Sequence, residues 1–269
     1  MSDDHKSVSL DMLETRLRDA EAELIAAIKK RAVAGEHMRV ALRGQGDGVA
    51  MGVLTGLERL LRQSAKANNS ELLLRWGVEF QIDMFAAGLQ KVMVSGSEPL
   101  RIWDHARSLF GHEVPMQFDK DQRENLTVCA DVEGAVGVLG WMTSAGSGQW
   151  WPILNETRYH DLRIVGAWPI FSDETPYAAV VAKGPLSELD GCRTLMMAHD
   201  DHHRVQRIFA SQDLAVTELS RARTLVLFEV PASVAEDDPR ISAARNAGLD
   251  GLRVVGSLPG ANAESQSSD

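Results

Sequence analysis

The densest group of side chains that could do chemistry is the run from His199 to His203, which holds three histidines and two aspartates. Imidazole and carboxylate groups are common metal ligands, and His199 and His203 are spaced to share one helix face. The run also lies where an expected strand meets an expected helix, so Asp200 or Asp201 could simply cap that helix. Both interpretations stay open, and we assign no metal-ligating residue from the sequence.

A second group is aromatic and flanks a glycine-rich stretch at 143–148. It consists of Trp141 on one side and Gln149, Trp150 and Trp151 on the other. Aromatic rings beside a glycine-rich loop could clamp an aromatic ligand. The alternative is that the indoles form a hydrophobic lid over a thin α/β layer. Separately, Cys129 lies in a strand-like pattern and is expected to be buried as a small hydrophobic residue.

Common catalytic signatures are absent from the chain, which contains no P-loop, no GxGxxG, no GxSxG and no CxxC pair. Its net charge of −10 argues against a nucleic-acid binder that works by neutralising phosphates. No apolar run reaches the length of a membrane span, and the acidic amino terminus is unlike a secretory signal. Two cysteines fit a reducing compartment, so we expect a cytoplasmic protein without nucleic-acid or membrane partners.

The elements that must position these groups begin with helices. Apolar residues spaced by three and four predict a long helix over 10–42, which the glycines after residue 43 end. Further helices are expected over 51–65 and 71–92, followed by a linker at 96–99. Such a long helix cannot bury its apolar stripe alone, so the sequence indicates a homodimer that forms through the N-terminal helices.

The rest of the chain alternates between strand and helix patterns. A helix over 100–110 precedes expected strands at 126–128, 135–141, 162–168 and 177–183. Over 192–259 the order β-α-β-β-α-β is that of a ferredoxin-like fold. The fold class is therefore α+β: a three-helix module, a small α/β segment and a ferredoxin-like segment. We expect domains at 1–95, 96–186 and 187–260, and a disordered polar tail at 261–269.

This order of parts resembles the bifunctional chorismate mutase–prephenate dehydratase family, which joins a helical mutase, a dehydratase domain and an ACT regulatory domain. The segments that carry the resemblance are LETRLRDAEAELIAAIKKRA (13–32), RIWDHARSLFG (101–111), EGAVGVL (133–139) and LRVVGSLPGA (252–261). The middle segment has about half the length that a dehydratase needs. Pro176-Tyr177 stands where the family has its threonine-arginine-phenylalanine stretch, so dehydratase activity is not expected.

The resemblance also implies a mutase site that needs no cofactor. Chorismate is a dicarboxylate, and its rearrangement to prephenate needs cationic donors on both carboxylates and on the ether oxygen. Arg31 matches a carboxylate-binding arginine of the family, and Glu58 can match its catalytic glutamate. Arg16, Arg39 and Arg43 are further substrate-binding candidates.

Two other family positions differ, because Glu14 and Leu42 stand where the family has an arginine and a lysine. The sequence therefore predicts a chorismate-mutase-family protein of aromatic amino-acid biosynthesis, with activity weakened or lost. The alternative is a non-catalytic dimeric module that senses a small metabolite through its ACT-like segment.

Overall fold

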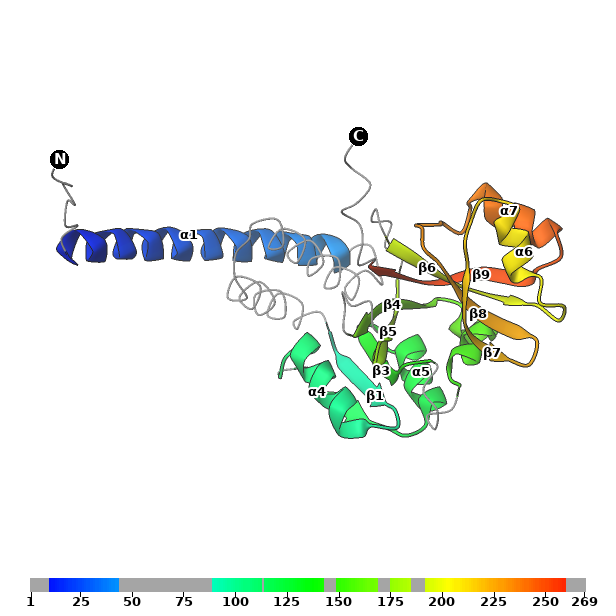
Figure 1. Cartoon of the computed structure of the whole chain (residues 1–269). Helices are drawn as coiled ribbons and strands as arrows, with labels where there is room; N and C mark the ends of the chain where they lie inside the picture. The colour runs from blue at the N-terminus through cyan, green and yellow to red at the C-terminus, as the bar shows by residue number, and fades with distance from the viewer. Residues whose placement is uncertain are drawn as a thin grey trace, which may run out of the picture.

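The described part of a computed structural model of the chain comprises residues 10–43, 89–112, 114–142, 149–168, 175–184 and 192–259. Within these residues one mixed sheet runs in the order β2-β1-β3-β5-β4-β9-β6-β8-β7 (Figure 1). Its strands are β1 (Lys91–Ser95), β2 (Met116–Phe118), β3 (Ala135–Gly140), β4 (Leu162–Trp168), β5 (Ala178–Lys183), β6 (Cys192–His199), β7 (Thr217–Ala222), β8 (Leu225–Val230) and β9 (Asp250–Pro259). The predicted α+β class is confirmed.

The first half of the sheet is covered on both faces. Strands β2, β1 and β3 are parallel, and β5 pairs antiparallel with both β3 and β4. Val92 and Val94 belong to the same core cluster as Ile102 of α4 (Pro99–Phe110). Met93, on the opposite face, shares a cluster with Leu126 of α5 (Gln122–Asp131). The alternation of buried residues along β1 thus places the two helices on opposite sides.

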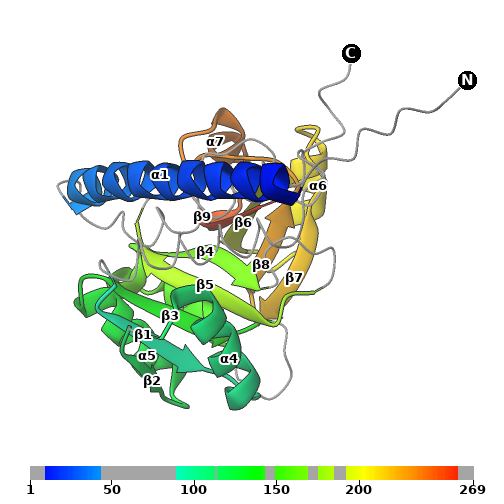
Figure 2. The same cartoon turned by 90° about the vertical axis from the view of Figure 1, so that its left-hand side faces the viewer.

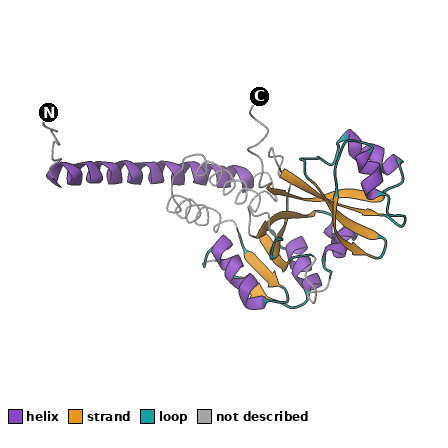
Figure 3. Cartoon of the chain, viewed as in Figure 1, coloured by secondary structure: helices purple, strands orange, loops and turns teal. Residues whose placement is uncertain are grey.

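The second half has the ferredoxin-like order that the sequence predicts. Helix α6 (Val205–Ala210) follows β6, and α7 (Pro239–Asn246) lies between β8 and β9. The strand order β9-β6-β8-β7 is that of a split βαβ fold. Both helices contribute to one core cluster with Met196 and Phe228, and Figure 3 shows them together on one side of the strands.

The two halves meet where β4 and β9 pair in parallel, with Ile164 opposite Gly256. The hydrophobic core is continuous across this junction, because one cluster contains Met93 of β1, Ile164 of β4 and Leu227 of β8. Two short 3-10 helices, η1 (Trp151–Asn155) and η2 (Thr157–Tyr159), lead into β4, and η1 places Trp151 in this cluster. The halves therefore share one core as well as one sheet.

The long predicted helix is confirmed as α1 (Leu10–Arg43). Figure 1 shows its amino-terminal half projecting beyond the sheet, and Figure 2 views the same helix with the strands behind it. Apolar side chains on this helix are exposed, including Leu17 at 61% and Val33 at 58%. Leu24 and Ile28 are partly buried, so the predicted stripe is covered over only part of its length.

The end of one predicted helix and one predicted strand are wrong. Residues 91–92, expected at the end of a helix over 71–92, begin strand β1. A short apolar run does not separate a buried strand from a helix by periodicity alone, and this run suits the centre of a parallel sheet. Residues 126–128, expected as a strand, lie inside α5, whose buried Leu126, Cys129 and Ala130 have helical spacing. The expected helix over 51–65 and most of the one over 71–92 fall outside the described residues.

Candidate ligand-binding pocket

The carboxyl ends of β1, β2 and β3 lie at one edge of the sheet because the three strands are parallel. In open α/β sheets this edge is where ligands usually bind, because the loops that follow the strands converge there. Strand β1 ends at Ser95, β2 is followed by Asp119, Lys120 and Asp121, and β3 ends at Gly140.

Local hydrogen bonds shape the loop after β2. The Asp121 backbone N–H donates to Asp119 Oδ1 at 2.9 Å, and the Arg123 N–H donates to Asp121 Oδ1 at 2.9 Å. Asp121 is thus the N-cap of α5, as its residue type favours. This cap fixes where α5 starts, and so it fixes which side chains of the first turn face the sheet.

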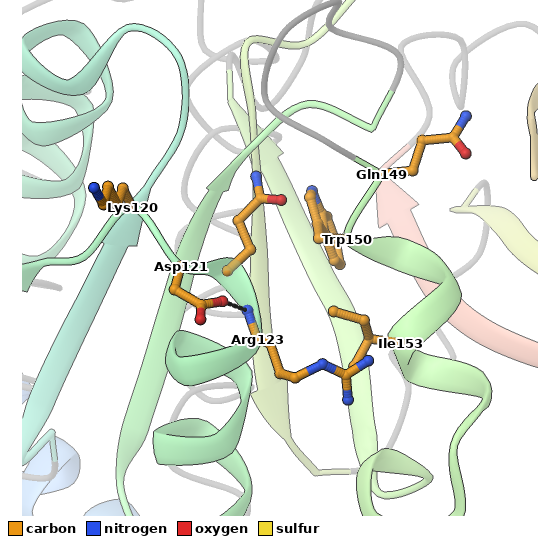
Figure 4. Close-up of a pocket in the computed structure, with 7 residues that line it drawn as sticks. Lys120, Asp121, Arg123, Gln149, Trp150 and Ile153 are labelled. Atoms are coloured by element: carbon orange, nitrogen blue, oxygen red, sulfur yellow. Dashed lines mark hydrogen bonds between the residues drawn. The ribbon is translucent and has the colours of Figure 1, made fainter.

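A pocket of about 490 Å³ opens beside this first turn (Figure 4). Figure 4 shows Lys120, Asp121 and Arg123 on one wall and Trp150 and Ile153 on the facing wall. The volume falls in the range of small-molecule sites. The described residues that line it are Lys120, Asp121, Gln122, Arg123, Gln149, Trp150 and Ile153.

Three buried polar atoms near this edge have no hydrogen-bond partner among the described residues: Ser95 Oγ, Gln122 Nε2 and Asn125 Oδ1. Ser95 and Asn125 are fully buried, and Gln122 is 9% exposed. Ser95 follows Met93 by two residues and so lies on the sheet face that α5 covers. Buried polar groups are normally paired, so each of these atoms calls for an explanation. Of the three residues, Gln122 belongs to the described pocket lining, and Ser95 and Asn125 do not.

The two cationic side chains at the pocket differ in their ion pairing. Arg123 donates two hydrogen bonds to Glu156, at 2.7 and 2.8 Å, and this pairing lowers the pKa of the Glu156 carboxyl. Lys120 makes no ion pair with any described residue. Asp121 adds a carboxylate, but that group already accepts the Arg123 N–H. Lys120 is therefore the cation that remains for a ligand.

The facing wall connects the pocket to the second half of the sheet. Gln149 Nε2 donates to the backbone oxygen of Arg221 at 3.1 Å and lies 3.4 Å from Ser220 Oγ. Trp150 Nε1 donates to the backbone oxygen of Gly140 at 2.8 Å. The wall is thus held by β3 on one side and by β7 on the other.

The indoles near this wall are mainly core residues. Trp141, Trp150 and Trp151 are all buried, and Trp151 Nε1 donates to Ser220 Oγ at 3.2 Å. Of the three, Trp150 alone lines the described pocket. The interpretation as a hydrophobic lid therefore fits better than an aromatic clamp. The glycine-rich stretch at 143–148 lies outside the described residues.

The histidine-rich run contains a helix cap. Asp200 is 1% exposed, and its carboxylate accepts the backbone N–H of Arg204 at 2.8 Å and of Val205 at 3.1 Å. Burial alone would raise the pKa of Asp200, but these N–H donors and the charge of Arg221 outweigh it and hold the pKa below its usual value.

The capping interpretation is thereby confirmed. Along the chain as far as it is described, no three His, Cys, Asp or Glu side chains are grouped to hold a metal.

The residues predicted for a mutase site are not brought to this pocket in the described structure. Arg16 is exposed and Arg31 partly buried, both on α1. Arg39 and Arg43 also belong to α1, and Glu58 lies outside the described residues. Their roles stay predictions.

Sequence reasoning missed Ser95, Gln122 and Asn125. The stretch around Asp121 reads as a charged loop, although an aspartate followed by Leu126, Cys129 and Ala130 at helical spacing does signal a capped helix. That signal would have placed Gln122 in the first turn of a helix at a strand end.

No protein-family profile matches the chain, and no curated protein sequence matches it. Among solved structures, it is similar to GqqA, described as a novel type of quorum quenching acylases, with 13% identity, a TM-score of 0.45, and coverage of 63% of this chain and 94% of that one. Prephenate dehydratase from Streptococcus mutans is similar at 11% identity and the same TM-score of 0.45, with coverage of 64% and 99%. Likeness at this level carries no argument about activity.

No helix in the described ranges has both the length and the apolar character needed to cross a lipid bilayer.

Proposed function

We propose that the chain is a metabolite-binding protein whose pocket beside the first turn of α5 takes a small polar molecule with an anionic group. The observation that carries this proposal is Gln122 Nε2, a buried donor of the pocket lining that has no hydrogen-bond partner among the described residues. Each unpaired buried polar group costs about 1–3 kcal/mol, so a partner that is present only when bound would relieve that cost.

The donors and acceptors define the ligand class. Gln122 offers an amide N–H to the pocket. Lys120 adds a positive charge at the rim, and the helix amino terminus favours negative charge. A hydroxylated or amino carboxylate matches this set, and chorismate, prephenate and phenylalanine are probes of that class.

Calorimetric titration of these three probes into the full chain tests the proposal. One of them should bind, and Gln122→Leu should weaken that binding by about tenfold, because the Leu side chain keeps the bulk but not the N–H. Arg158→Gln is the matched control, since Arg158 is exposed and pairs with Asp131 away from the pocket lining. An affinity that Gln122→Leu leaves unchanged contradicts the proposed site.

Chorismate mutase activity is the second candidate. It is supported by the formation of α1 at the predicted length, with Arg16 and Arg31 on it. In this proposal Arg31 binds a substrate carboxylate, Glu58 assists, and Arg16, Arg39 and Arg43 complete the cationic surroundings. The measurement is the conversion of chorismate to prephenate by the full chain, and by Arg31→Ala. Conversion that is absent, or unaffected in Arg31→Ala, removes this candidate.

We further propose a homodimer that forms through the N-terminal helices, with α1 antiparallel to α1 of a second copy. Residues 10–28 carry five acidic and two basic side chains, whereas residues 29–43 carry five basic and one acidic. Antiparallel pairing sets the acidic half of each helix against the basic half of the other. It also covers exposed apolar side chains on one face of the helix, such as Leu13 and Leu17.

Sedimentation velocity tests the dimer. Leu17→Lys should shift the chain toward monomer, and so should high salt, which screens the opposed charges. Leu100→Lys is the control, because Leu100 is also exposed, at 81%, but lies on α4. A wild-type chain that is monomeric at high concentration contradicts the arrangement.

A further inference from the structure

Two arginines meet where the halves of the sheet join, away from the pocket lining. Arg163 lies near the start of β4 and Arg253 lies in the middle of β9, the strand that pairs with β4. Arg253 Nη2 donates to the backbone oxygen of His160 at 2.9 Å, and Arg163 Nη1 donates to the same oxygen. The two guanidinium groups therefore converge on one carbonyl oxygen.

Neither guanidinium has a carboxylate within 4.0 Å among the described residues, whereas Arg123, Arg240 and Arg245 each have one. Glu236 and Asp161 act on both arginines electrostatically, and each raises their pKa. Glu236 is already paired with Arg245 and accepts the backbone N–H of Val254 at 2.7 Å, and Asp161 is exposed. The junction thus holds two positive charges that these carboxylates offset without forming an ion pair with either arginine.

Burial lowers the pKa of both arginines, and the charge of Arg163 helps to lower that of Arg253 to about 10. A lowered arginine pKa means that the surroundings disfavour the charged form. An anion placed between the two groups would reverse that effect.

The two side chains also keep donors in reserve. Arg253 uses Nη1 for the backbone oxygen of Leu154, at 2.9 Å, and Nη2 for His160. Within the described structure Arg163 bonds only through Nη1, to the oxygens of His160 and Leu162. Among the described residues, no hydrogen bond is made by either Nε–H group or by Arg163 Nη2.

We propose that Arg163 and Arg253 form a binding site for a small oxyanion, a carboxylate or a phosphate group, at the β4–β9 junction. Two guanidinium forks offer the paired N–H geometry that such groups accept. The site is distinct from the pocket, because none of its residues lines that cavity. Helix η1 touches both, since Ile153 lines the pocket and the next residue, Leu154, accepts the Arg253 bond.

The test is binding of inorganic phosphate and, in a separate arm, acetate, to the full chain at constant ionic strength. Calorimetry and the melting temperature are the readouts, and the two arms distinguish a phosphate site from a carboxylate site. We expect saturable binding by the wild type. The dissociation constant should rise about tenfold in Arg163→Gln and should not change in Arg158→Gln. No saturable binding of either anion, or binding that Arg163→Gln leaves intact, overturns the site.

Two further variants keep the test decisive. If Arg163→Gln does not fold, Arg163→Lys is the replacement variant, because lysine keeps the positive charge but lacks the guanidinium fork. The affinity for the anion should still fall in this variant, and an unchanged affinity overturns the proposal. Lys120→Gln separates this site from the pocket. Phosphate binding that survives Lys120→Gln supports the junction, whereas binding lost in that variant belongs to the pocket and removes the junction site.

Discussion

The backbone of Gly256 in β9 lies directly against Ile164 in β4, at the parallel pairing that joins the two halves of the sheet. A Cβ at position 256 would stand 2.6 Å from the backbone oxygen of Ile164 and 2.7 Å from its Cβ. Both obstacles are rigid parts of a central strand. The close approach of β4 and β9 therefore requires glycine at this position.

We expect Gly256→Ala to destabilise the protein by about 1–3 kcal/mol, because the two strands must separate to admit a methyl group. Urea denaturation measures the change in the free energy of unfolding. The control is the neighbouring Ser257→Ala, which removes a buried hydroxyl without a partner and should cost little. Equal stability of Gly256→Ala and wild type would show that β4 and β9 can accommodate a methyl group at position 256.

Ser95 gives a prediction about stability, because its side chain is not among the residues that line the pocket. Its hydroxyl is fully buried and has no partner among the described residues, so Ser95→Ala should stabilise the chain by up to about 1 kcal/mol. Thermal unfolding of the ligand-free chain measures this effect.

Thr194→Val is the contrasting control for Ser95. The Thr194 hydroxyl donates to the backbone oxygen of Ala232 at 2.7 Å and accepts the N–H of Val234 at 2.9 Å. Removing it leaves both backbone groups without this partner and should cost about 1–3 kcal/mol. If both substitutions lower the free energy of unfolding alike, the Ser95 hydroxyl has a hydrogen-bond partner, such as a bound water.

The ferredoxin-like half was predictable because the local sequence of each helix and strand there indicates its type and its start. Pro239 after Asp238 marks the start of α7, and the Asp238 side chain indeed accepts the Arg240 N–H at 2.8 Å. Met196 and Met197 form part of an apolar run bounded by polar residues, and both are fully buried in β6.

What the sequence did not reveal depends on long-range pairing. β1 is recognisable as a strand only through its neighbours β2 and β3, which lie 21 or more residues further along the chain. The pocket depends on the same pairing, since the loop after β2 and the start of α5 reach this edge of the sheet only when β1 and β2 align. Arg163 and Arg253 are 90 residues apart, and no local pattern connects them.

Asp200 predicts a pH dependence. Its folded-state pKa lies below the ordinary value of 3.8, so its contribution is present above that value and is lost as pH falls through the folded pKa. Asp200→Asn, which weakens the cap of α6, should cost about 1 kcal/mol at neutral pH. The difference in the free energy of unfolding between Asp200→Asn and wild type should become smaller at acidic pH.

Unfolding free energies measured from neutral pH down to pH 3 check this expectation. Asp201→Asn is the control, because Asp201 is exposed and its neighbour provides the cap bonds. A gap that is constant over this range would mean that the Asp200 charge does not stabilise the fold.

We expect the Cys129 thiol to be unreactive in the folded protein. It is 1% exposed in α5, where its Sγ faces Gly137 of β3, and burial raises its pKa to about 12. Only the thiolate reacts readily with disulfide reagents, so native Cys129 should stay unmodified at pH 8. In a Cys192→Ser background, labelling should follow the rate of opening of α5 and should accelerate with denaturant. Immediate labelling without denaturant would show that α5 detaches from β3 readily, and it would also undermine the pocket, because α5 supplies Gln122 and Asn125 from the same surface.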